Sequence, residues 1–212
     1  TTTAVLKNLK EIPGGFYSVK GWVTTGSQIS AAVEMPVRKL GVSQVPKAVN
    51  GIQELREALY KAADELQTQV TFDVDNLSLE ELKNFKFTQY PILSECLNGL
   101  ECNLTHEDGV VKNITYTLKY KKMYEVLKAY KDSEAYGNKI STEAKESLKV
   151  AKTVISNIIN DKMTDYEKEK VIHDYIVANT AYSNVIVNDV TNPIYGVEGV
   201  LLNKVAVCQG YA

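Results

Sequence analysis

Residues 205–212 read VAVCQGYA, a short apolar stretch followed by a cysteine, a glycine and an aromatic residue. The apolar residues 205–207 predict a short buried strand, and Gly210 has no side chain, so a substrate or a packed strand can approach the backbone closely. Cys208 is then expected where a loop passes into a helix. At that junction the helix dipole and the unpaired N–H groups favour a thiolate and a developing oxyanion. Cys208 is therefore either a nucleophile or a small buried structural cysteine.

A helix is predicted upstream of this segment. Thr164 and Glu167 are spaced as a capping box, in which Thr164 is the N-cap and Glu167 reaches back to its N–H group. The residues that follow predict one helix over about residues 165–180, because apolar and aromatic side chains recur at helical spacing, at Val171, Tyr175, Ala178 and Tyr182.

Three separated segments carry a family resemblance, namely KVIHDYI at 170–176, YG at 195–196 and VCQGYA at 207–212. Their order and spacing resemble the transglutaminase-like superfamily in its bacterial form, and the match covers about residues 141–212. The resemblance implies a papain-like core in which Cys208 is the nucleophile, with a histidine and an aspartate or asparagine on strands further downstream. Ala206 stands where the family often has glycine, which is a departure at the local turn.

The resemblance also implies a reaction and a location. The thiol would form a thioester with an acyl group of a protein, peptide or cell-wall amide, and the acyl group would pass to an amine or to water. Members of the bacterial family are often exported, which predicts an extracellular or cell-surface location. No metal constellation is visible in the sequence, and we infer no cofactor.

Neither histidine of the chain fits the role of the catalytic base. His173 lies on the predicted helix, close to where the family carries a histidine that is not catalytic, so packing or a surface hydrogen bond is expected for it. His106 precedes an Asp-Gly turn and is typical of a hairpin tip. We expect the chain to be catalytically incomplete as it stands, and to be completed by downstream residues, a second fragment or an exchange between protomers. The alternative is a non-catalytic binding or scaffolding module with a transglutaminase-like fold.

Composition narrows the range of partners. Twenty-four basic residues against 26 acidic residues give a formal net charge of -2, so no global field attracts nucleic acid or an anionic membrane. The longest apolar runs are far short of the roughly 20 residues that span a bilayer, so no membrane span is expected. Five lysines lie near three tyrosines between residues 119 and 131, a pattern that would also suit a surface for polyanions. We expect a solvated face instead, because acidic residues are interspersed.

Two other cysteines, Cys96 and Cys102, are close enough in sequence to pair if residues 97–101 turn back. That disulfide would leave Cys208 as a free thiol. The other possibility, which we favour, is that both are reduced and buried, since sequence spacing does not set disulfide geometry.

The whole chain is predicted to have an α+β fold, with an N-terminal α/β region followed by the helical first part of a transglutaminase-like (papain-like) core. Residues 1–47 form a strand-rich or extended segment in which Trp22 is an internal anchor. Residues 48–140 form a small α/β domain, and residues 141–212 the N-terminal part of the core. The predicted elements are a helix over 52–66, a strand over 70–74, a helix N-capped by Ser78 with Glu81 three residues later, and a helix over 141–160 whose core stripe is Leu148, Ala151, Ile155 and Ile158. A hairpin of 100–104 and 114–120 is predicted around Asp108-Gly109. One face of this hairpin is expected to be buried, because apolar side chains take every second position on both strands, at Leu100, Cys102, Leu104, Ile114, Tyr116, Leu118 and Tyr120.

Overall fold

The computed structural model describes residues 45–185, 187–189 and 191–211 in full, and the backbone of four strands nearer the N-terminus. These strands are β1 (Gly15–Gly21), β2 (Thr24–Thr25), β3 (Gln28–Ile29) and β4 (Val33–Lys39). Strand β1 pairs antiparallel with β4, and β2 pairs antiparallel with β3. The described part of residues 1–47 is therefore strand-rich, as predicted, while Trp22 lies outside the described residues.

A four-stranded sheet organises the α/β region. Its strands are β5 (Ala48–Asn50), β6 (Gln69–Asp75), β7 (Leu97–Glu107) and β8 (Val110–Tyr120), in the order β5-β6-β8-β7. Strands β5 and β6 run parallel and are joined by helix α1 (Gly51–Asp64), whereas the other neighbours are antiparallel. The predicted helix 52–66 and strand 70–74 are confirmed. Strand β5 was not predicted, because three residues carry too little alternation to be recognised.

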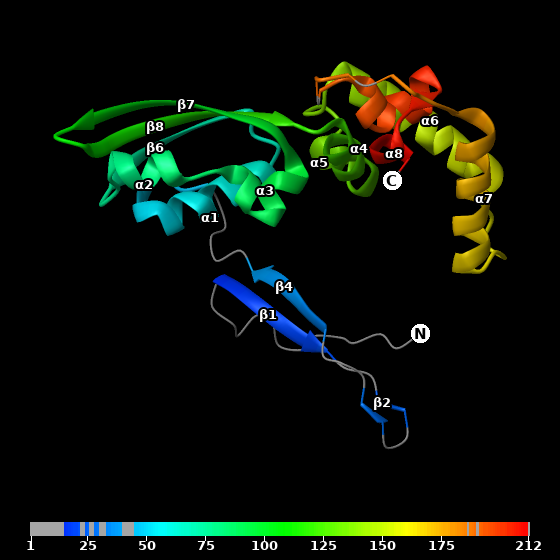
Figure 1. The fold of residues 1–212 in the computed structure, drawn as a ribbon, viewed down its shortest axis with the longest axis horizontal. Helices are drawn as coiled ribbons and strands as arrows, with labels where there is room; N and C mark the ends of the chain where they lie inside the picture. Colours follow the sequence, from blue (N-terminus) through cyan, green and yellow to red (C-terminus); the bar gives the residue numbers. More distant parts are fainter. Residues whose placement is uncertain are drawn as a thin grey trace.

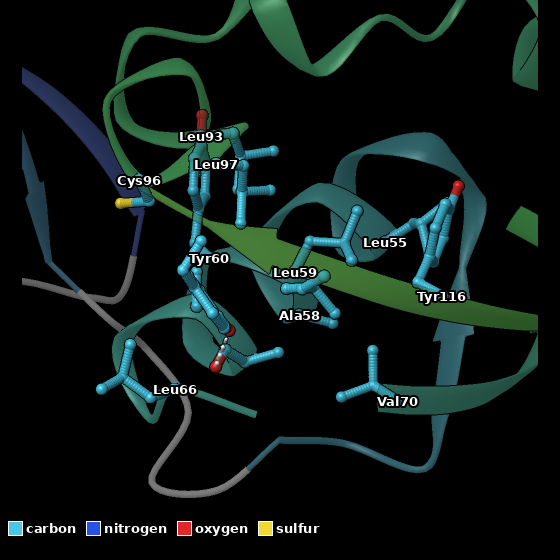
Figure 2. Close-up of a cluster of buried hydrophobic side chains, with 14 of the residues drawn as sticks. Leu55, Ala58, Leu59, Tyr60, Leu66, Val70, Leu93, Cys96, Leu97 and Tyr116 are labelled. Atoms are coloured by element: carbon cyan, nitrogen blue, oxygen red, sulfur yellow. Dashed lines mark hydrogen bonds between the residues drawn. The ribbon is translucent and has the colours of Figure 1, made fainter. Parts of the chain in front are cut away.

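One face of this sheet is covered by helices. Helices α1, α2 (Leu79–Asn84) and α3 (Pro91–Cys96) lie along the same face (Figure 1). Every second residue of β6 is buried on that side, and Phe72 at its centre is fully enclosed. Figure 2 shows side chains of α1, among them Leu55 and Leu59, meeting those of α3 and the strands in one apolar cluster. The opposite face is polar, with Thr71 and Thr115 sharing a hydrogen bond of 2.9 Å across the strands.

The predicted hairpin is present, but only one of its strands is buried. Asp108 and Gly109 form the turn with φ values of 48° and 79°, the conformation that an Asp-Gly pair favours in two-residue hairpins. Ile114, Tyr116, Leu118 and Tyr120 of β8 are buried, as predicted.

The partner strand β7 is different. Leu104 is 36% exposed and Cys102 is exposed, so the burial predicted for them is wrong. Strand β7 is the edge of the sheet, and the hairpin tip extends beyond α2 (Figure 1), so the described residues cover this part of the apolar side only incompletely. Cys96 is buried as predicted, and Cys96 and Cys102 are both free thiols.

The remainder of the described chain is mainly helical. Helices α4 (Lys122–Lys131), α5 (Ser133–Tyr136), α6 (Thr142–Ile158) and α7 (Asp165–Asn179) follow one another. Ser141 caps α6, and Thr164 with Glu167 forms the predicted capping box of α7. Ser78 and Glu81 form a second capping box at α2, again as predicted. The α+β fold class is thus confirmed.

The helices of this second region are less buried than predicted. Of the predicted stripe on α6, Leu148 is buried, whereas Ala151, Ile155 and Ile158 are only half-buried. Helix α7 has no buried residue, although its capping box was predicted correctly. Of its predicted stripe, Val171 and Tyr175 are half-buried, Ala178 is exposed, and Tyr182 lies beyond the end of the helix. Among the described residues, no helix is both long and apolar enough to cross a membrane.

A buried carboxylate ties α4, in residues 48–140, to the start of α6, in residues 141–212. Glu125 on α4 is 7% exposed, and it accepts hydrogen bonds from the backbone N–H (3.0 Å) and the hydroxyl (2.8 Å) of Ser141. Lys122 lies 3.3 Å from Glu125 and donates to the Ser141 hydroxyl at 2.8 Å. The cap of α6 is therefore held against α4 by a charge-assisted network.

Candidate functional site

The C-terminal segment carries Cys208 on a short strand and a helical turn. After α7 the chain forms β9 (Ala181–Tyr182), the turns η3 (Pro193–Tyr195) and η4 (Gly199–Asn203), strand β10 (Val205–Ala206) and helix α8 (Cys208–Tyr211). Strand β10 pairs parallel with β9. Ala206 is fully buried, but Val205 is 38% exposed, so the predicted burial of residues 205–207 is only partly correct. Successive side chains of a strand point to opposite faces, so the buried Ala206 lies on the covered face of the β9–β10 pair and Val205 lies on the opposite face.

Gly210 lies against the turn η3, and this contact positions α8. A side chain at Gly210 would place its Cβ atom 2.7 Å from the carbonyl oxygen of Ile194 and 2.9 Å from the Cβ atom of Ala206. The backbone N–H of Val207 donates to the same Ile194 carbonyl at 3.0 Å. The close approach predicted at Gly210 is therefore present, and the approaching group is a turn of the protein itself. Cys208 sits between these two anchor points.

Cys208 is the first residue of α8 and is exposed. The alternative of a buried structural cysteine is thus wrong. The sulfur makes no hydrogen bond with another residue in the described part of the chain. Because the dipole of a four-residue turn is small, activation of this thiol requires a neighbouring base or cation.

An aromatic contact joins α8 to the end of α7. The hydroxyl of Tyr211 donates to the backbone carbonyl of Thr180 at 2.5 Å, and Thr180 is buried. The rings of Tyr211 and Tyr182 lie 6.1 Å apart. The segment after the cysteine is therefore fixed at both its glycine and its tyrosine.

The structure places neither histidine at Cys208. His173 is exposed on α7, and its Nδ1 atom lies 3.2 Å from the carboxylate of Asp174, which is the surface hydrogen bond predicted for it. His106 is exposed on β7 opposite Val111, near the hairpin tip, again as predicted. Over the described residues, no group of three or more histidine, cysteine, aspartate or glutamate side chains is arranged to hold a metal ion.

A cleft of about 570 Å³ opens beside the cysteine segment. One wall comes from the start of β7 and the junction of β8 with α4, and the other from residues 191–198 with Gln209 and Gly210. This volume is within the usual range for pockets that bind small molecules or side chains. The residues that directly follow Cys208 therefore face a cleft whose opposite wall belongs to the α/β region.

Three lysines line the cleft, and two of them are already paired. Lys119 forms an ion pair with Glu101, and Lys122 is held by Glu125 and Ser141. Lys121 forms no ion pair with another described residue. The face predicted to be simply solvated is thus partly a cleft wall, because residues 191–198 fold over it.

Glu198 is the acidic group most withdrawn from water in this cleft. Burial raises the pKa of its carboxyl, and the negative charges of Glu125 and Glu143 act in the same direction. A hydrogen bond from its own backbone N–H and the positive charge of Lys122 oppose that rise in pKa. Sequence patterns did not single out Glu198, because it stands alone between apolar residues and its partners are distant in the chain.

Comparison with models of known protein families and with curated proteins finds no match for this chain.

Proposed function

We propose that the chain carries the nucleophile of a transglutaminase-like cysteine enzyme, and that Cys208 attacks an amide of a protein, a peptide or the cell wall. The observation that carries this proposal is an exposed thiol beside a cleft, on a backbone fixed through Val207 and Gly210. A reactive cysteine has to be both reachable and rigidly positioned. The order of the segments 170–176, 195–196 and 207–212 supports the choice of family.

The proposed reaction has two steps. The thiolate adds to the amide carbonyl, the carbon–nitrogen bond breaks, and the departing amine takes a proton from a general acid. An amine or a water molecule then attacks the thioester, gives up a proton to the same group acting as a base, and the carbon–sulfur bond breaks to release the thiolate. No cofactor or metal ion enters either step.

Both steps need an acid–base group, and the two histidines lie elsewhere in the structure. In this proposal the base comes from outside residues 1–212 or from a second copy of the chain. An extracellular or cell-surface location is proposed on the family resemblance alone.

The test is the rate of alkylation of each cysteine by iodoacetamide between pH 4 and pH 9, measured by peptide mass spectrometry on the protein in its natural full length. Cys102 is the internal control, because it is also exposed as a residue while partial burial of its thiol raises its pKa. We expect Cys208 to be alkylated at a lower pH than Cys102, because an activated nucleophile is present as thiolate where an ordinary thiol is still protonated. Equal pH profiles for the two cysteines would contradict the proposal.

A turnover assay completes the test. The full-length protein is incubated with a glutamine-containing protein and a fluorescent amine, and both covalent incorporation of the amine and release of ammonia are measured. Cys208→Ala should abolish both signals, while Cys102→Ala should leave them unchanged.

The second candidate is a non-catalytic binding or scaffolding module. It is favoured by one observation, namely that the Cys208 thiol has no hydrogen-bond partner among the described residues. Ordinary thiol reactivity and no turnover, in a protein that still binds peptides in the cleft, would support the module over the enzyme.

A further inference from the structure

The cleft beside Cys208 contains a carboxylate that no basic side chain of the described residues contacts as an ion pair. Glu198 is half-buried and lines the cleft, and it forms no ion pair within 4.0 Å with another described residue. A carboxylate that is partly removed from water and left unpaired is unfavourable, and a cation brought by a ligand would relieve that cost.

Gly196 leaves room for the carboxylate of Glu198. If Gly196 carried a side chain, its Cβ atom would lie 2.5 Å from Oε2 of Glu198, which is closer than any real contact. The carboxylate therefore occupies the space that a side chain at position 196 would need. Glycine at position 196 thus allows the carboxylate to lie over the turn that contacts α8.

The same turn connects Glu198 to the cysteine segment. The carbonyl oxygen of Gly196 lies 3.4 Å from the position of a Cβ atom on Gly210, two residues after Cys208. Glu198, Gln209 and Gly210 all line one cleft. A ligand that reaches the Cys208 segment through this cleft thus passes close to the carboxylate.

The neighbouring charges leave this carboxylate available. Lys119 and Lys122 line the cleft but are engaged by Glu101 and by Glu125. Lys121 is the cation on the opposite wall and forms no ion pair with a described residue, and Glu95 in the same cleft is exposed. The alkyl part of a ligand would meet Met123 and Tyr195, which also line the cleft.

We propose that Glu198 is a specificity residue that binds a basic side chain, such as that of lysine, on the peptide whose amide Cys208 attacks. This inference rests on the proposed function, because it assigns the bound cation to the substrate of Cys208. The bound amine is not the attacking amine of the second step. A carboxylate stabilises the protonated ammonium form, and an ammonium nitrogen has no lone pair with which to attack a thioester.

The test measures peptide binding in the absence of chemistry. The probes are fluorescein-labelled hexapeptides with one glutamine and one lysine, in which the lysine lies one, two or three residues to either side of the glutamine. Each has a matched peptide with Nε-acetyl-lysine. Binding to the full-length protein carrying Cys208→Ala is followed by fluorescence anisotropy. At least one lysine peptide should bind about tenfold more tightly than its acetylated partner, as expected for one charge-assisted hydrogen bond.

Two further substitutions, made in the Cys208→Ala protein, locate the cation site. Glu198→Gln should remove the tenfold preference for lysine, and Gly196→Ala should reduce it because the new Cβ atom displaces the carboxylate while keeping its charge. Glu134→Gln is the control, because Glu134 is exposed on α5 and its loss changes the net charge equally. Unchanged melting temperatures would show that the variants fold.

Three results would overturn the inference: no saturable binding of any lysine peptide, equal binding of the acetylated peptides, or an unchanged lysine preference in Glu198→Gln. The outcome is separable from that of the proposed function. A reactive Cys208 without a lysine preference refutes the cation site alone, whereas Glu198-dependent binding beside an unreactive Cys208 refutes the enzyme alone.

Discussion

Side chains are buried more completely in the α/β region than in the helical region after residue 140. In the first, the sheet and α1 enclose side chains such as Phe72, Leu55 and Leu59 completely. In the second, α7 has no buried residue and α6 is buried only near its N-terminal end. The comparison teaches that helix signals and core formation are separate properties, because caps act within one helix and burial needs a second element.

The largest expected effect concerns the core of the first region. Phe72→Ala should lower the free energy of unfolding by about 3–5 kcal/mol, because it leaves a cavity in a fully enclosed site. Ile172→Ala on α7 should cost about 1 kcal/mol or less, since that side chain is only half-buried. Urea denaturation followed by circular dichroism measures both. Similar losses for the two variants would show that α7 is as well supported as the sheet.

The next effect concerns the connection between the two regions. Glu125→Gln should cost about 2 kcal/mol, because two hydrogen bonds from Ser141 and the contact with Lys122 lose a buried charge. Hydrogen exchange should become faster in α4 and in the first turn of α6.

Glu143→Gln is the matched control, since Glu143 is exposed and lies 3.9 Å from the same lysine. We expect it to cost less than about 0.5 kcal/mol. Equal losses of stability for Glu125→Gln and Glu143→Gln would contradict the claim that Glu125 holds α6 against α4.

A smaller effect is expected from removing the N-cap hydroxyl of either capping box. Thr164→Ala and Ser78→Ala each remove an N-cap hydroxyl, and each should cost about 1 kcal/mol locally. For Thr164→Ala we expect faster amide exchange confined to the first turns of α7, with no change in the exchange of β6 or β8. A loss of protection that spreads into the sheet would mean that α7 and the α/β region unfold together.

The smallest effect is a pH dependence at the start of α7. Hydrogen bonds from the backbone N–H and then the hydroxyl of Thr164 lower the pKa of Glu167 below its ordinary value. A lowered pKa in the folded state means that the ionised carboxylate stabilises the fold above the ordinary pKa, and that this stability is lost as the pH falls through the lowered value.

Amide exchange in the first turn of α7 should therefore become faster, relative to the rest of the helix, upon acidification through that range. The Glu167→Gln variant should not show this step. A step of the same size in the variant would assign the pH dependence to another group.

Sequence reasoning was most successful where the signal and its consequence lie within a few residues. The capping boxes at Ser78 and Thr164, the Asp-Gly turn and the alternation of β8 were all predicted correctly. The placement of Cys208 at the start of a helix and the need for glycine at position 210 were also correct. The exposure of the thiol was left open by the sequence.

Three of the failures share one physical cause. Cys102, Leu104 and Val205 follow the patterns of buried strand residues, yet they are exposed because the described part of the chain encloses them only incompletely. Apolar periodicity states which face of an element is suited to burial, but it does not state whether another part of the chain reaches that face. Short strands such as β5 were missed because they have too few residues to show a period.

The sequence by itself determined the α+β class, the helix caps, the hairpin turn and the position of Cys208 at the junction of strand and helix. These features depend on backbone preferences and hydrogen bonds between residues close in the chain. Only the tertiary structure decided three features: the exposure of the thiol, the hydrogen bonds from Ser141 to the Glu125 carboxylate, and the cleft that Glu198 shares with the cysteine segment. Each of these brings together residues far apart in sequence, and their proximity is set by packing.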